Sequence, residues 1–395
     1  MNKKYPDSLL KRGVAEIIVE EEMKKLLHSG ATLRLKQGFD PSRPDIHLGH
    51  VVGLRKLREF QELGHKVILI IGDWTAQIGD PSGVSVTRPM LSAAEVQRNA
   101  QTYLVQFFKV VDEKKTEVRW QSEWFKNWTL SDVMRISSKF TLAQFMARED
   151  FNKRYTAGRP IALIELIYPI LQAYDSVAIN SSVEFGGVDQ KFNCLVGRDL
   201  QIAMGQKPQQ VLLVPLLVGI DGTHKMSKSL NNYIGITDEP EDMYGKVMSI
   251  PDTLIINYFE LVTDVSDEEL VELKHQMETQ TVNPMLLKQR LAHEIVKQFH
   301  GKDAAIAAEK HFARVFQKKE KPDAILEFRL PDSAVSIIDI LHAAGLVKSR
   351  TEARRLLEQG AIDIDDVKLH GGDINFPLHS GSIVKIGKRR FIRLL

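Results

Sequence analysis

The segment between residues 32 and 71 has the pattern of a strand, a helix and a second strand, and this order constrains the fold more than any other feature. Residues 32–39 are typical of a strand, and VILII at 67–71 is a short, fully apolar one. Between His47 and Leu63 an apolar residue recurs at every third position, which indicates one buried face of a helix. Two strands joined by a crossover helix lie parallel in one sheet. The sequence therefore predicts an α/β fold with a parallel sheet.

The rest of the chain has two helical stretches, one further strand signal and a small mixed unit. VLLVPLLV at 211–218 is typical of a buried strand, in which Pro215 indicates an edge, a bulge or an early end. Residues 92–175 and 240–316 are mainly helical in pattern. The polar stretch 317–323 is typical of a linker, and a small α+β unit is predicted after it.

The bulk properties fit a protein of two or three domains without a membrane span. The chain has 395 residues and a formal net charge of +2, which neither requires nor excludes a nucleic-acid partner. A single cysteine, Cys194, rules out an intrachain disulfide and suits a reducing compartment. The charged amino terminus lacks the apolar core of a signal peptide, and no apolar run is long enough to cross a bilayer. A cytoplasmic protein is expected.

The first motif with chemical content is His47-Leu48-Gly49-His50, at the start of the helix that follows the first strand. The amino end of a helix has unpaired N–H groups and the positive end of a dipole, so it attracts phosphate. Gly49 leaves room for a nucleotide against the backbone, and two histidines three residues apart can donate hydrogen bonds to the same phosphates. A pair of surface histidines near a helix cap is the alternative, but the position after a strand favours phosphate binding.

The second motif is Lys225-Met226-Ser227-Lys228-Ser229, in a loop that leaves the apolar strand. Two lysines with hydroxyl groups between them form a cation clamp that could neutralise charge on a transferring or departing phosphate. A solvated basic loop is the alternative. Open α/β sheets bind ligands at the carboxyl ends of their strands, which favours the phosphate-binding interpretation.

Together the two motifs resemble the paired signatures H-I-G-H and K-M-S-K-S of the class I aminoacyl-tRNA synthetases. The second matches letter for letter, and the first differs only at Leu48. The resemblance implies a Rossmann-like catalytic domain that uses ATP as a substrate together with Mg²⁺, without a tightly bound cofactor or a metal ligand on the protein. It also implies catalytic roles for His47, His50, Lys225 and Lys228.

Three further segments could form a pocket for an amino acid. Tyr168, Gln172 and Asp175 are spaced to face the same side of one helix. A core helix with incidental polar residues is the alternative, although a buried glutamine and a buried aspartate would need partners. The turns GGVDQ at 186–190 and GDPSG at 79–83 carry acids or an amide and are weak signals on their own.

All three segments resemble the substrate-binding segments of tyrosyl-tRNA synthetases. The resemblance implies that Asp175 accepts a hydrogen bond from the substrate phenol. It further implies that Asp80, Tyr168 and Gln172 hold the ammonium group of the substrate, with Gln190 beside the amino acid. A buried carboxylate that lacks its hydroxyl partner is costly, so phenylalanine would be rejected, an effect for which this family is the standard example. The residues implied for nucleotide binding are Asp40, Ser42, His47, Gly49, His50, Asp189, Lys225, Met226, Ser227 and Lys228.

The sequence departs from the family pattern at two positions. Many members carry a tyrosine two residues before the glycine of G-F-D-P, where it also contacts the phenol, and this chain has Lys36 there. A glutamine that is common near the pocket is Glu184 in this chain. These departures indicate a different subgroup and leave open an enzyme for another aromatic amino acid, such as tryptophan. A non-catalytic RNA-binding protein with a synthetase fold is the alternative from another class, and both intact motifs argue against it.

Residues 334–395 form a small basic unit with ten Lys or Arg against seven Asp or Glu. Its order of two helices and short strands resembles the RNA-binding module that a ribosomal protein shares with bacterial tyrosyl enzymes. The resemblance implies that Arg350, Arg354 and Arg355 face tRNA phosphates. A solvated basic tail is the alternative, but the unit has apolar residues of its own.

Over nearly the whole chain, the resemblance implies a bacterial-type tyrosyl-tRNA synthetase with three parts. These are a Rossmann-like catalytic domain at 1–232 with a helical dimerisation insert at about 110–190, an α-helical domain at 233–320 for the anticodon region, and the small α+β RNA-binding module at 334–395. The implied reaction activates tyrosine with ATP, releases pyrophosphate and transfers tyrosine to the 3′ end of tRNA(Tyr). A homodimer in the cytoplasm, without contact with a membrane, is implied as well.

Overall fold

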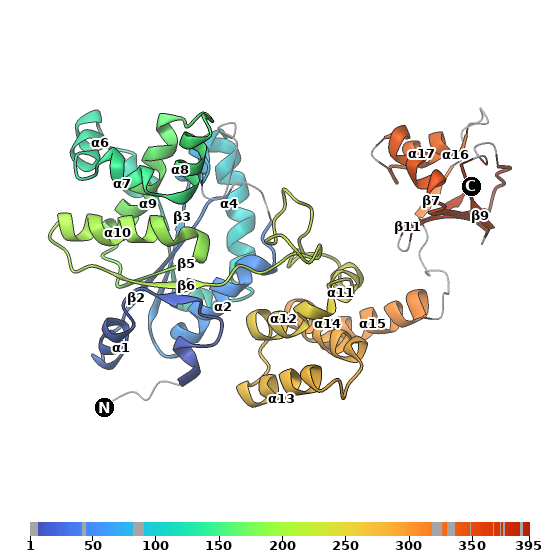
Figure 1. The fold of residues 1–395 in the computed structure, drawn as a ribbon, viewed down its shortest axis with the longest axis horizontal. Coiled ribbons are helices and arrows are strands. Elements are labelled where there is room, and N and C mark those ends of the chain that lie inside the picture. The colour runs from blue at the N-terminus through green and yellow to red at the C-terminus, as the bar shows by residue number, and fades with distance from the viewer. Residues whose placement is uncertain are drawn as a thin grey trace. The chain divides into compact units, whose positions relative to one another are not determined.

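Figure 1 shows the computed structural model of the chain, which divides into two compact units, Met1–Ile306 and Ala307–Leu395. The structure describes residues 7–41, 45–81, 91–317, 326–329, 336–347, 349–365, 367–371, 373, 376–387 and 390–395. The linker expected at 317–323 lies, except for its first residue, outside the described residues.

The first unit contains a six-stranded sheet that is mostly parallel. The strands lie in the order β1 (Glu16–Ile17), β6 (Gln210–Val214), β5 (Val183–Gly187), β2 (Arg34–Phe39), β3 (Lys66–Ile71) and β4 (Thr116–Trp120). The pairs from β6 to β4 are all parallel, and β1 pairs antiparallel with β6 at one edge. The predicted α/β fold with a parallel sheet is therefore confirmed.

The sheet changes its winding direction between β2 and β5. From β2 the chain crosses through α2 (Leu48–Glu62) to β3 on one side, whereas from β5 it crosses through α10 (Lys191–Ala203) to β6 on the other side. Right-handed crossovers in opposite directions place their helices on opposite faces, so α2 and α10 cover the two faces of the sheet (Figure 1). The crevice at the carboxyl ends of β2 and β5, where the strand order reverses, is where such sheets bind ligands.

Local sequence explains where the elements around this crevice begin and end. The helix predicted between His47 and Leu63 is α2, with His47 as its cap and Gly64 in the left-handed region (φ 88°) after it. Strand β6 ends at Val214, because Pro215 has no N–H to donate to the sheet. Of the three possibilities that the proline left open, an early strand end is the one observed.

The stretch 92–175 is mainly helical, as predicted, but it also contains β4, which the sequence pattern does not reveal. Strand β4 is an edge strand with every side chain half-buried, so no apolar run marks it. Strand β5 is not predicted from the sequence either, because the sequence indicates only the turn at its end.

The other helices before α10 are α1 (Glu20–His28), α3 (Thr75–Ile78), α4 (Ala93–Phe107), α5 (Ser122–Phe125), α6 (Leu130–Ser137), α7 (Leu142–Met146), α8 (Glu149–Thr156) and α9 (Leu163–Ala178). Short 3-10 turns lie at Asp7–Leu10, Glu113–Lys115 and Val188–Gln190.

The helical stretch predicted at 240–316 is confirmed. It comprises a 3-10 turn at Asp252–Leu254 and the helices α11 (Pro240–Met248), α12 (Ile255–Val262), α13 (Asp267–Glu278), α14 (Pro284–His300) and α15 (Lys302–Phe312), followed by a π-helical turn at Ala313–Gln317. Helix α12 packs against α2, where the buried Arg55 donates to the Leu261 carbonyl at 2.8 Å and pairs with Asp264. These contacts join the part of the helical stretch that lies in the first unit, up to Ile306, to the helix that covers the sheet. Among the described residues, no helix combines the length and the apolar character that crossing a membrane requires.

The second unit begins within α15, and its described residues after Gln317 form a five-stranded sheet and two helices, in agreement with the predicted small α+β unit. Its strands lie in the order β7 (Leu326–Phe328), β11 (Arg390–Leu394), β10 (Ile383–Ile386), β8 (Ile362–Ile364) and β9 (Val367–Leu369). Helices α16 (Ile337–Ala343) and α17 (Arg350–Glu358) pack against one another and share an apolar core with the strands. Ser349 caps α17 by accepting a hydrogen bond from the Glu352 N–H at 3.2 Å.

Candidate active site

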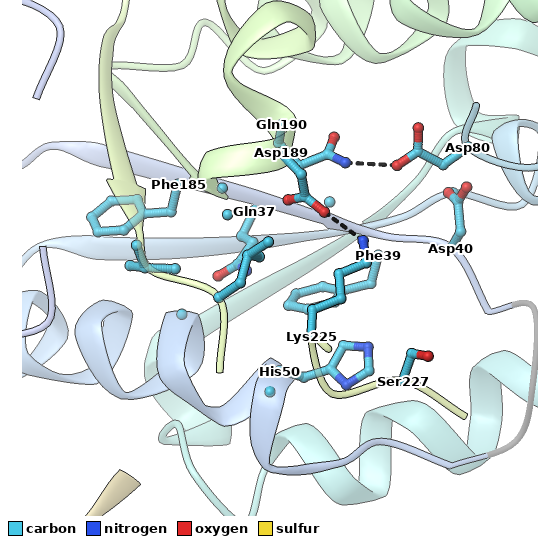
Figure 2. A pocket seen from close by; sticks show the side chains of 18 of the residues that line it. Gln37, Phe39, Asp40, His50, Asp80, Phe185, Asp189, Gln190, Lys225 and Ser227 are labelled. Carbon is cyan, nitrogen blue, oxygen red and sulfur yellow. Dashed lines mark hydrogen bonds and ion pairs between the residues drawn. The ribbon is translucent and has the colours of Figure 1, made fainter. Parts of the chain in front are cut away.

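A cavity of about 780 Å³ opens at the carboxyl ends of β2 and β5, in the crevice where the strand order reverses. Its walls also include the amino end of α2, helix α9 and the loop that follows β6. Figure 2 shows part of this lining. Of the residues predicted for the site, the lining includes Asp40, His47, Gly49, His50, Asp80, Tyr168, Gln172, Asp175, Asp189, Gln190, Lys225, Met226 and Ser227.

The remaining predicted site residues lie elsewhere. Ser42 is outside the described residues. Lys228 lies between the lining residues Ser227 and Ser229, but its ammonium group donates to the Asp45 carbonyl and lies 5.5 Å from the centre of the Tyr103 ring. In the second unit, the arginines predicted to bind tRNA are exposed on α17: Arg350, which pairs with Asp339 at 2.7 Å, Arg354 and Arg355.

His47 and His50 are held as neutral rings with a defined tautomer. The Nδ1 atom of His47 accepts from the Gly49 N–H, and that of His50 accepts from the His47 N–H, both at 3.2 Å. Burial, assisted by nearby positive charge, lowers the pKa of His47 well below its usual value and that of His50 to about 4. At neutral pH each ring therefore carries its proton on Nε2 and can donate one hydrogen bond to a phosphate oxygen.

Gly49 keeps the amino end of α2 open. A Cβ at this position would lie 3.0 Å from two ring atoms of His47 and 3.7 Å from the Cβ of Met226. A side chain here would therefore press against the capping histidine. Met226 is buried, so the lysine-containing loop packs close to the start of the helix.

The loop that carries the two lysines is anchored by its backbone and by a buried asparagine. Lys225 forms an antiparallel bridge with Val218. Asn232 accepts from the Ser227 N–H at 2.8 Å and donates to the Lys225 carbonyl at 3.1 Å. No motif points to Asn232, because its part in the site depends on how the loop folds back. Across the cavity, the Lys225 ammonium lies 2.9 Å from the Asp189 carboxylate (Figure 2).

Asp40 orients two hydroxyl groups beside the cavity. The Tyr168 hydroxyl donates to Oδ2 at 2.8 Å and the Thr75 hydroxyl to Oδ1 at 2.7 Å. Gly72 is needed next to them, since a Cβ there would lie 2.2 Å from Oδ1. Burial raises the pKa of Tyr168 well above its usual value, so the phenol stays protonated. Its oxygen therefore keeps lone pairs that could accept from a ligand donor.

Asp175 is a buried carboxylate that receives one donor on each oxygen. Gln121 donates to Oδ2 at 2.9 Å and the Trp124 ring N–H to Oδ1 at 3.1 Å. Burial raises the pKa of Asp175 to about 7, while the charge of Lys36 acts in the opposite direction. Each oxygen keeps a further lone pair, so the group can accept from one more hydroxyl. Neither Gln121 nor Trp124 is indicated by a motif, since they follow the strand that the sequence pattern hides.

A single asparagine, Asn193, contacts two of the glutamines that line the cavity. The Asn193 Nδ2 atom lies 3.2 Å from Gln172 Oε1 and 3.0 Å from Gln190 Oε1. Gln190 in turn donates to the Asp80 carboxylate at 2.6 Å (Figure 2). Three residues predicted from separate segments are thus joined in one polar wall.

Behind this wall, the two residues that depart from the family pattern form a buried ion pair. Lys36 and Glu184 are register partners in β2 and β5, with Nζ and Oε1 2.9 Å apart and side chains that are 0% and 1% exposed. The lysine also donates to the Ser176 hydroxyl at 2.8 Å and to the Gln172 carbonyl at 2.7 Å. Neither charged side chain lines the cavity. The two departures from the family pattern therefore change the residues behind the pocket wall.

Gln37 is a lining residue that no motif indicates. Its Oε1 atom is buried without a hydrogen-bond partner in the part of the chain that the structure describes. Gly53 of α2 makes room for this amide, because a Cβ there would lie 2.6 Å from Gln37 Nε2. A buried, unpaired acceptor is costly, so Gln37 is a candidate for contact with a ligand donor.

The described residues contain no cluster of three or more His, Cys, Asp or Glu side chains that could hold a metal ion. The donor set around the cavity therefore does not form a protein cage. Magnesium is commonly bound through substrate phosphates with few protein ligands, and such a site would need the nucleotide to complete it.

Comparison with known proteins relates this cavity to one family. The family described as tRNA synthetases class I (W and Y) matches residues 28–317. The chain is 62% identical to the tyrosine–tRNA ligase of Dehalococcoides mccartyi (strain CBDB1) over 390 residues, 98% of each chain. It is 50% identical to that of Thermotoga maritima over 388 residues, 98% of this chain and 96% of the relative.

Two solved structures share the fold at lower identity. A tyrosyl-tRNA synthetase from Archaeoglobus fulgidus, complexed with L-tyrosine, has a TM-score of 0.63 at 23% identity, covering 76% of this chain and 98% of its own. A C-terminally truncated mitochondrial tyrosyl-tRNA synthetase from Aspergillus nidulans has a TM-score of 0.64 at 20% identity, covering 78% and 93%. Both structures support the assignment of the fold. The activity is supported by the relatives of higher sequence identity.

Proposed function

Because this chain belongs to the class I tRNA synthetases, and within them to the tyrosine–tRNA ligases, we propose that the cavity at the ends of β2 and β5 is where tyrosine is activated and transferred. In this family ATP and tyrosine give tyrosyl-adenylate and pyrophosphate, and the tyrosyl group then passes to the 3′ end of the tRNA. The relatives argue against both the tryptophan enzyme and the non-catalytic RNA-binding protein.

The observation that carries the proposal is the meeting of both motifs at one cavity. The amino end of α2, with His47 and His50, and the loop with Lys225 line the same space, although they are far apart in sequence. A neutral N–H donor array beside a cation suits a polyphosphate, because it supplies both hydrogen bonds and charge. The charge comes from the lysines, since the two rings are neutral at pH 7.

We assign the nucleotide to this side of the cavity. His47, His50, Lys225 and Lys228 act on the phosphates, and Asp189 binds the ribose. The unpaired oxygen of Gln37 supports a further contact with a nucleotide hydroxyl or amino group. The other residues assigned to ATP are Asp40, Ser42, Gly49, Met226 and Ser227.

We assign the amino acid to the side formed by α9. Asp175 accepts from the phenol of tyrosine, which is the donor that its remaining lone pairs can take. Asp80, Tyr168 and Gln172 hold the ammonium group, and Gln190 lies beside the amino acid. Phenylalanine would leave the buried carboxylate without this donor, so it would be rejected.

The first step needs positioning and charge stabilisation more than a base. The tyrosine carboxylate is already a nucleophile at neutral pH, and its oxygen forms a bond to the α-phosphorus while the bond to pyrophosphate breaks. Lys225 and Lys228 stabilise the charge that gathers on the departing pyrophosphate. Mg²⁺ would be carried by the nucleotide phosphates, where it would offset part of their negative charge.

The parts outside the cavity serve tRNA binding and assembly in this proposal. Arg350, Arg354 and Arg355 contact tRNA phosphates, supported by their exposure on α17. The helices at 233–320 contact the anticodon region. A homodimer forms through the helices of about 110–190, supported by exposed apolar side chains there. The enzyme works in the cytoplasm, where tRNA is charged.

Pyrophosphate exchange tests the function. Labelled pyrophosphate is followed into ATP with tyrosine, phenylalanine or tryptophan supplied separately. Exchange with tyrosine alone is expected. Exchange with tryptophan instead would keep the reaction and overturn the assignment of Asp175, whereas folded protein without any exchange would favour the RNA-binding alternative.

A further inference from the structure

A chain of hydrogen bonds runs behind the amino-acid side of the cavity, between two buried charges. Arg148 donates to Asn193 Oδ1 at 3.2 Å, and Asn193 Nδ2 donates to Gln172 Oε1 at 3.2 Å. Gln172 Nε2 then donates to Glu184 Oε1 at 3.1 Å. Arg148, Asn193 and Glu184 are 7%, 1% and 1% exposed, so water hardly competes for these bonds.

The charges at the two ends fix the direction of this chain. A side-chain amide can be turned so that its oxygen and its NH₂ group exchange places. A guanidinium group only donates and an ionised carboxylate only accepts. Asn193 must therefore turn its oxygen to Arg148 and its NH₂ to Gln172, and Gln172 must turn its NH₂ to Glu184. Glu184 forms an ion pair with Lys36, with Nζ and Oε1 2.9 Å apart.

A branch of this chain of hydrogen bonds runs in the same direction from donor to acceptor. Asn193 Nδ2 also lies 3.0 Å from Gln190 Oε1, and Gln190 Nε2 donates to the Asp80 carboxylate at 2.6 Å. Since an ionised aspartate only accepts, the Gln190 amide is fixed from both sides as well. Asn193 thus sets the orientation of the Gln172 and Gln190 amides on the cavity wall.

We propose that Asn193, Lys36 and Glu184 are positioning residues for tyrosine, which hold the Gln172 oxygen ready to accept from the substrate ammonium group. The inference rests on the proposed binding of tyrosine beside α9. If the Gln172 amide were reversed, its NH₂ group would face the ammonium group, and two donors repel one another. The register of β2 and β5, which places Lys36 opposite Glu184, is therefore part of the tyrosine site.

The decisive variant is Asn193→Asp. Aspartate has nearly the same size and can pair with Arg148, so the fold is expected to persist. It only accepts hydrogen bonds, so Gln172 and Gln190 would have to turn their NH₂ groups toward it. In pyrophosphate exchange, the KM for tyrosine is expected to rise about tenfold or more, while kcat and the KM for ATP stay within about twofold.

A matched control makes the same kind of change away from the cavity. Gln61 is a buried amide that donates to the Asp112 carbonyl and the Thr116 hydroxyl and accepts from the Asp112 N–H. Gln61→Glu is expected to lower the unfolding temperature and to leave the KM for tyrosine unchanged. A merely structural role of Asn193 would give its variant the same behaviour as this control.

A second variant changes the Lys36–Glu184 end of the chain of hydrogen bonds. Lys36→Met combined with Glu184→Gln removes both buried charges with little change in volume, and it replaces an obligatory acceptor by an amide that can turn either way. The same selective rise in the KM for tyrosine is expected. An unchanged KM in either variant, shown by thermal unfolding to be folded, overturns the positioning role. Wild-type enzyme without tyrosine-dependent exchange would instead overturn the proposed function, so the two failures are distinguishable.

Discussion

The ammonium group of Lys225 lies 2.9 Å from the carboxylate of Asp189, so this ion pair joins the lysine-containing loop to the 3-10 turn after β5 across the cavity. The two side chains are 43% and 24% exposed, so water and salt weaken the pair and it contributes little to stability. Phosphate oxygens can take over the lysine while ribose hydroxyls approach the aspartate. This ion pair therefore joins the two parts of the nucleotide site that we propose.

Lys228→Ala is expected to lower tyrosine-dependent pyrophosphate exchange by about 10²-fold or more, because a cation near the phosphates is lost. The unfolding temperature should hardly change, since the ammonium group donates to a backbone carbonyl and lies 5.5 Å from the centre of an aromatic ring, and neither contact is an ion pair. Lys207→Ala, at an exposed position outside the cavity, is the control. Exchange at the wild-type rate in the Lys228 variant would remove its proposed role.

Gly53→Ala is expected to raise the KM for ATP several-fold, because the new Cβ would lie 2.6 Å from the Gln37 amide and displace it. Gly245→Ala is the matched control, since a Cβ at this position in α11 meets no atom within 4 Å. Alanine in the middle of a helix is favoured over glycine by about 0.5–1 kcal/mol, so the control should be slightly stabilised. Equal KM values for ATP in both variants would remove Gln37 from the nucleotide site.

The kcat/KM for tyrosine is expected to rise as the pH passes through about 7. Burial raises the pKa of Asp175 to about 7, with Lys36 opposing and Glu184 supporting this shift. The ionised carboxylate, which predominates above this pKa, is the better acceptor for the phenol. For stability the sign is opposite: the folded state holds the extra proton between about pH 4 and 7, so this group's contribution falls as pH rises through that window. Asp175→Asn should remove the step in kcat/KM, and a flat wild-type profile from about pH 6 to 8 would contradict the assignment.

The double variant Arg354→Ala/Arg355→Ala is expected to weaken tRNA charging and to leave pyrophosphate exchange unchanged. Both side chains are exposed on α17, in the unit that does not contain the cavity. The logarithm of the association constant for tRNA falls linearly with the logarithm of the salt concentration. Each phosphate contact that is lost should make this slope shallower by roughly one unit. Lys114→Ala/Lys115→Ala, also exposed, is the control. An unaltered salt slope would place the tRNA elsewhere.

Leu163→Glu is expected to turn a dimer into a monomer in sedimentation at micromolar concentration. Leu163 is 81% exposed, and Leu130 and Leu142 on nearby parts of the same helical stretch are 75% and 64% exposed. A charge in place of an exposed apolar side chain at the proposed interface would oppose association. Val271→Glu, at a position 66% exposed on α13, makes the same change outside this stretch. Wild-type protein that sediments only as a monomer would contradict the dimer.

The sequence predicts the parallel sheet correctly, and it supports a proposal for the nucleotide side because each motif is a short segment that carries its own chemistry. His47 and Lys225 could be proposed from neighbours in sequence alone. The support of the amino-acid side could not, since Lys36 and Glu184 become neighbours only through the register of β2 and β5. Gln121 follows a strand without an apolar run, and for this reason its contact with Asp175 is also hidden in the sequence.

The buried pair of Lys36 and Glu184 constrains how the sequence can evolve. Changing one partner alone leaves an uncompensated buried charge, which costs about 3–5 kcal/mol. That is a large share of the free energy of unfolding of most domains. A chain with only one of the two charged residues would therefore be much less stable and would be selected against. Homologous chains are therefore expected to carry both residues or neither, and the two positions should change together across lineages. The pair would then divide the descendants of a common ancestor into two groups with few sequences in between.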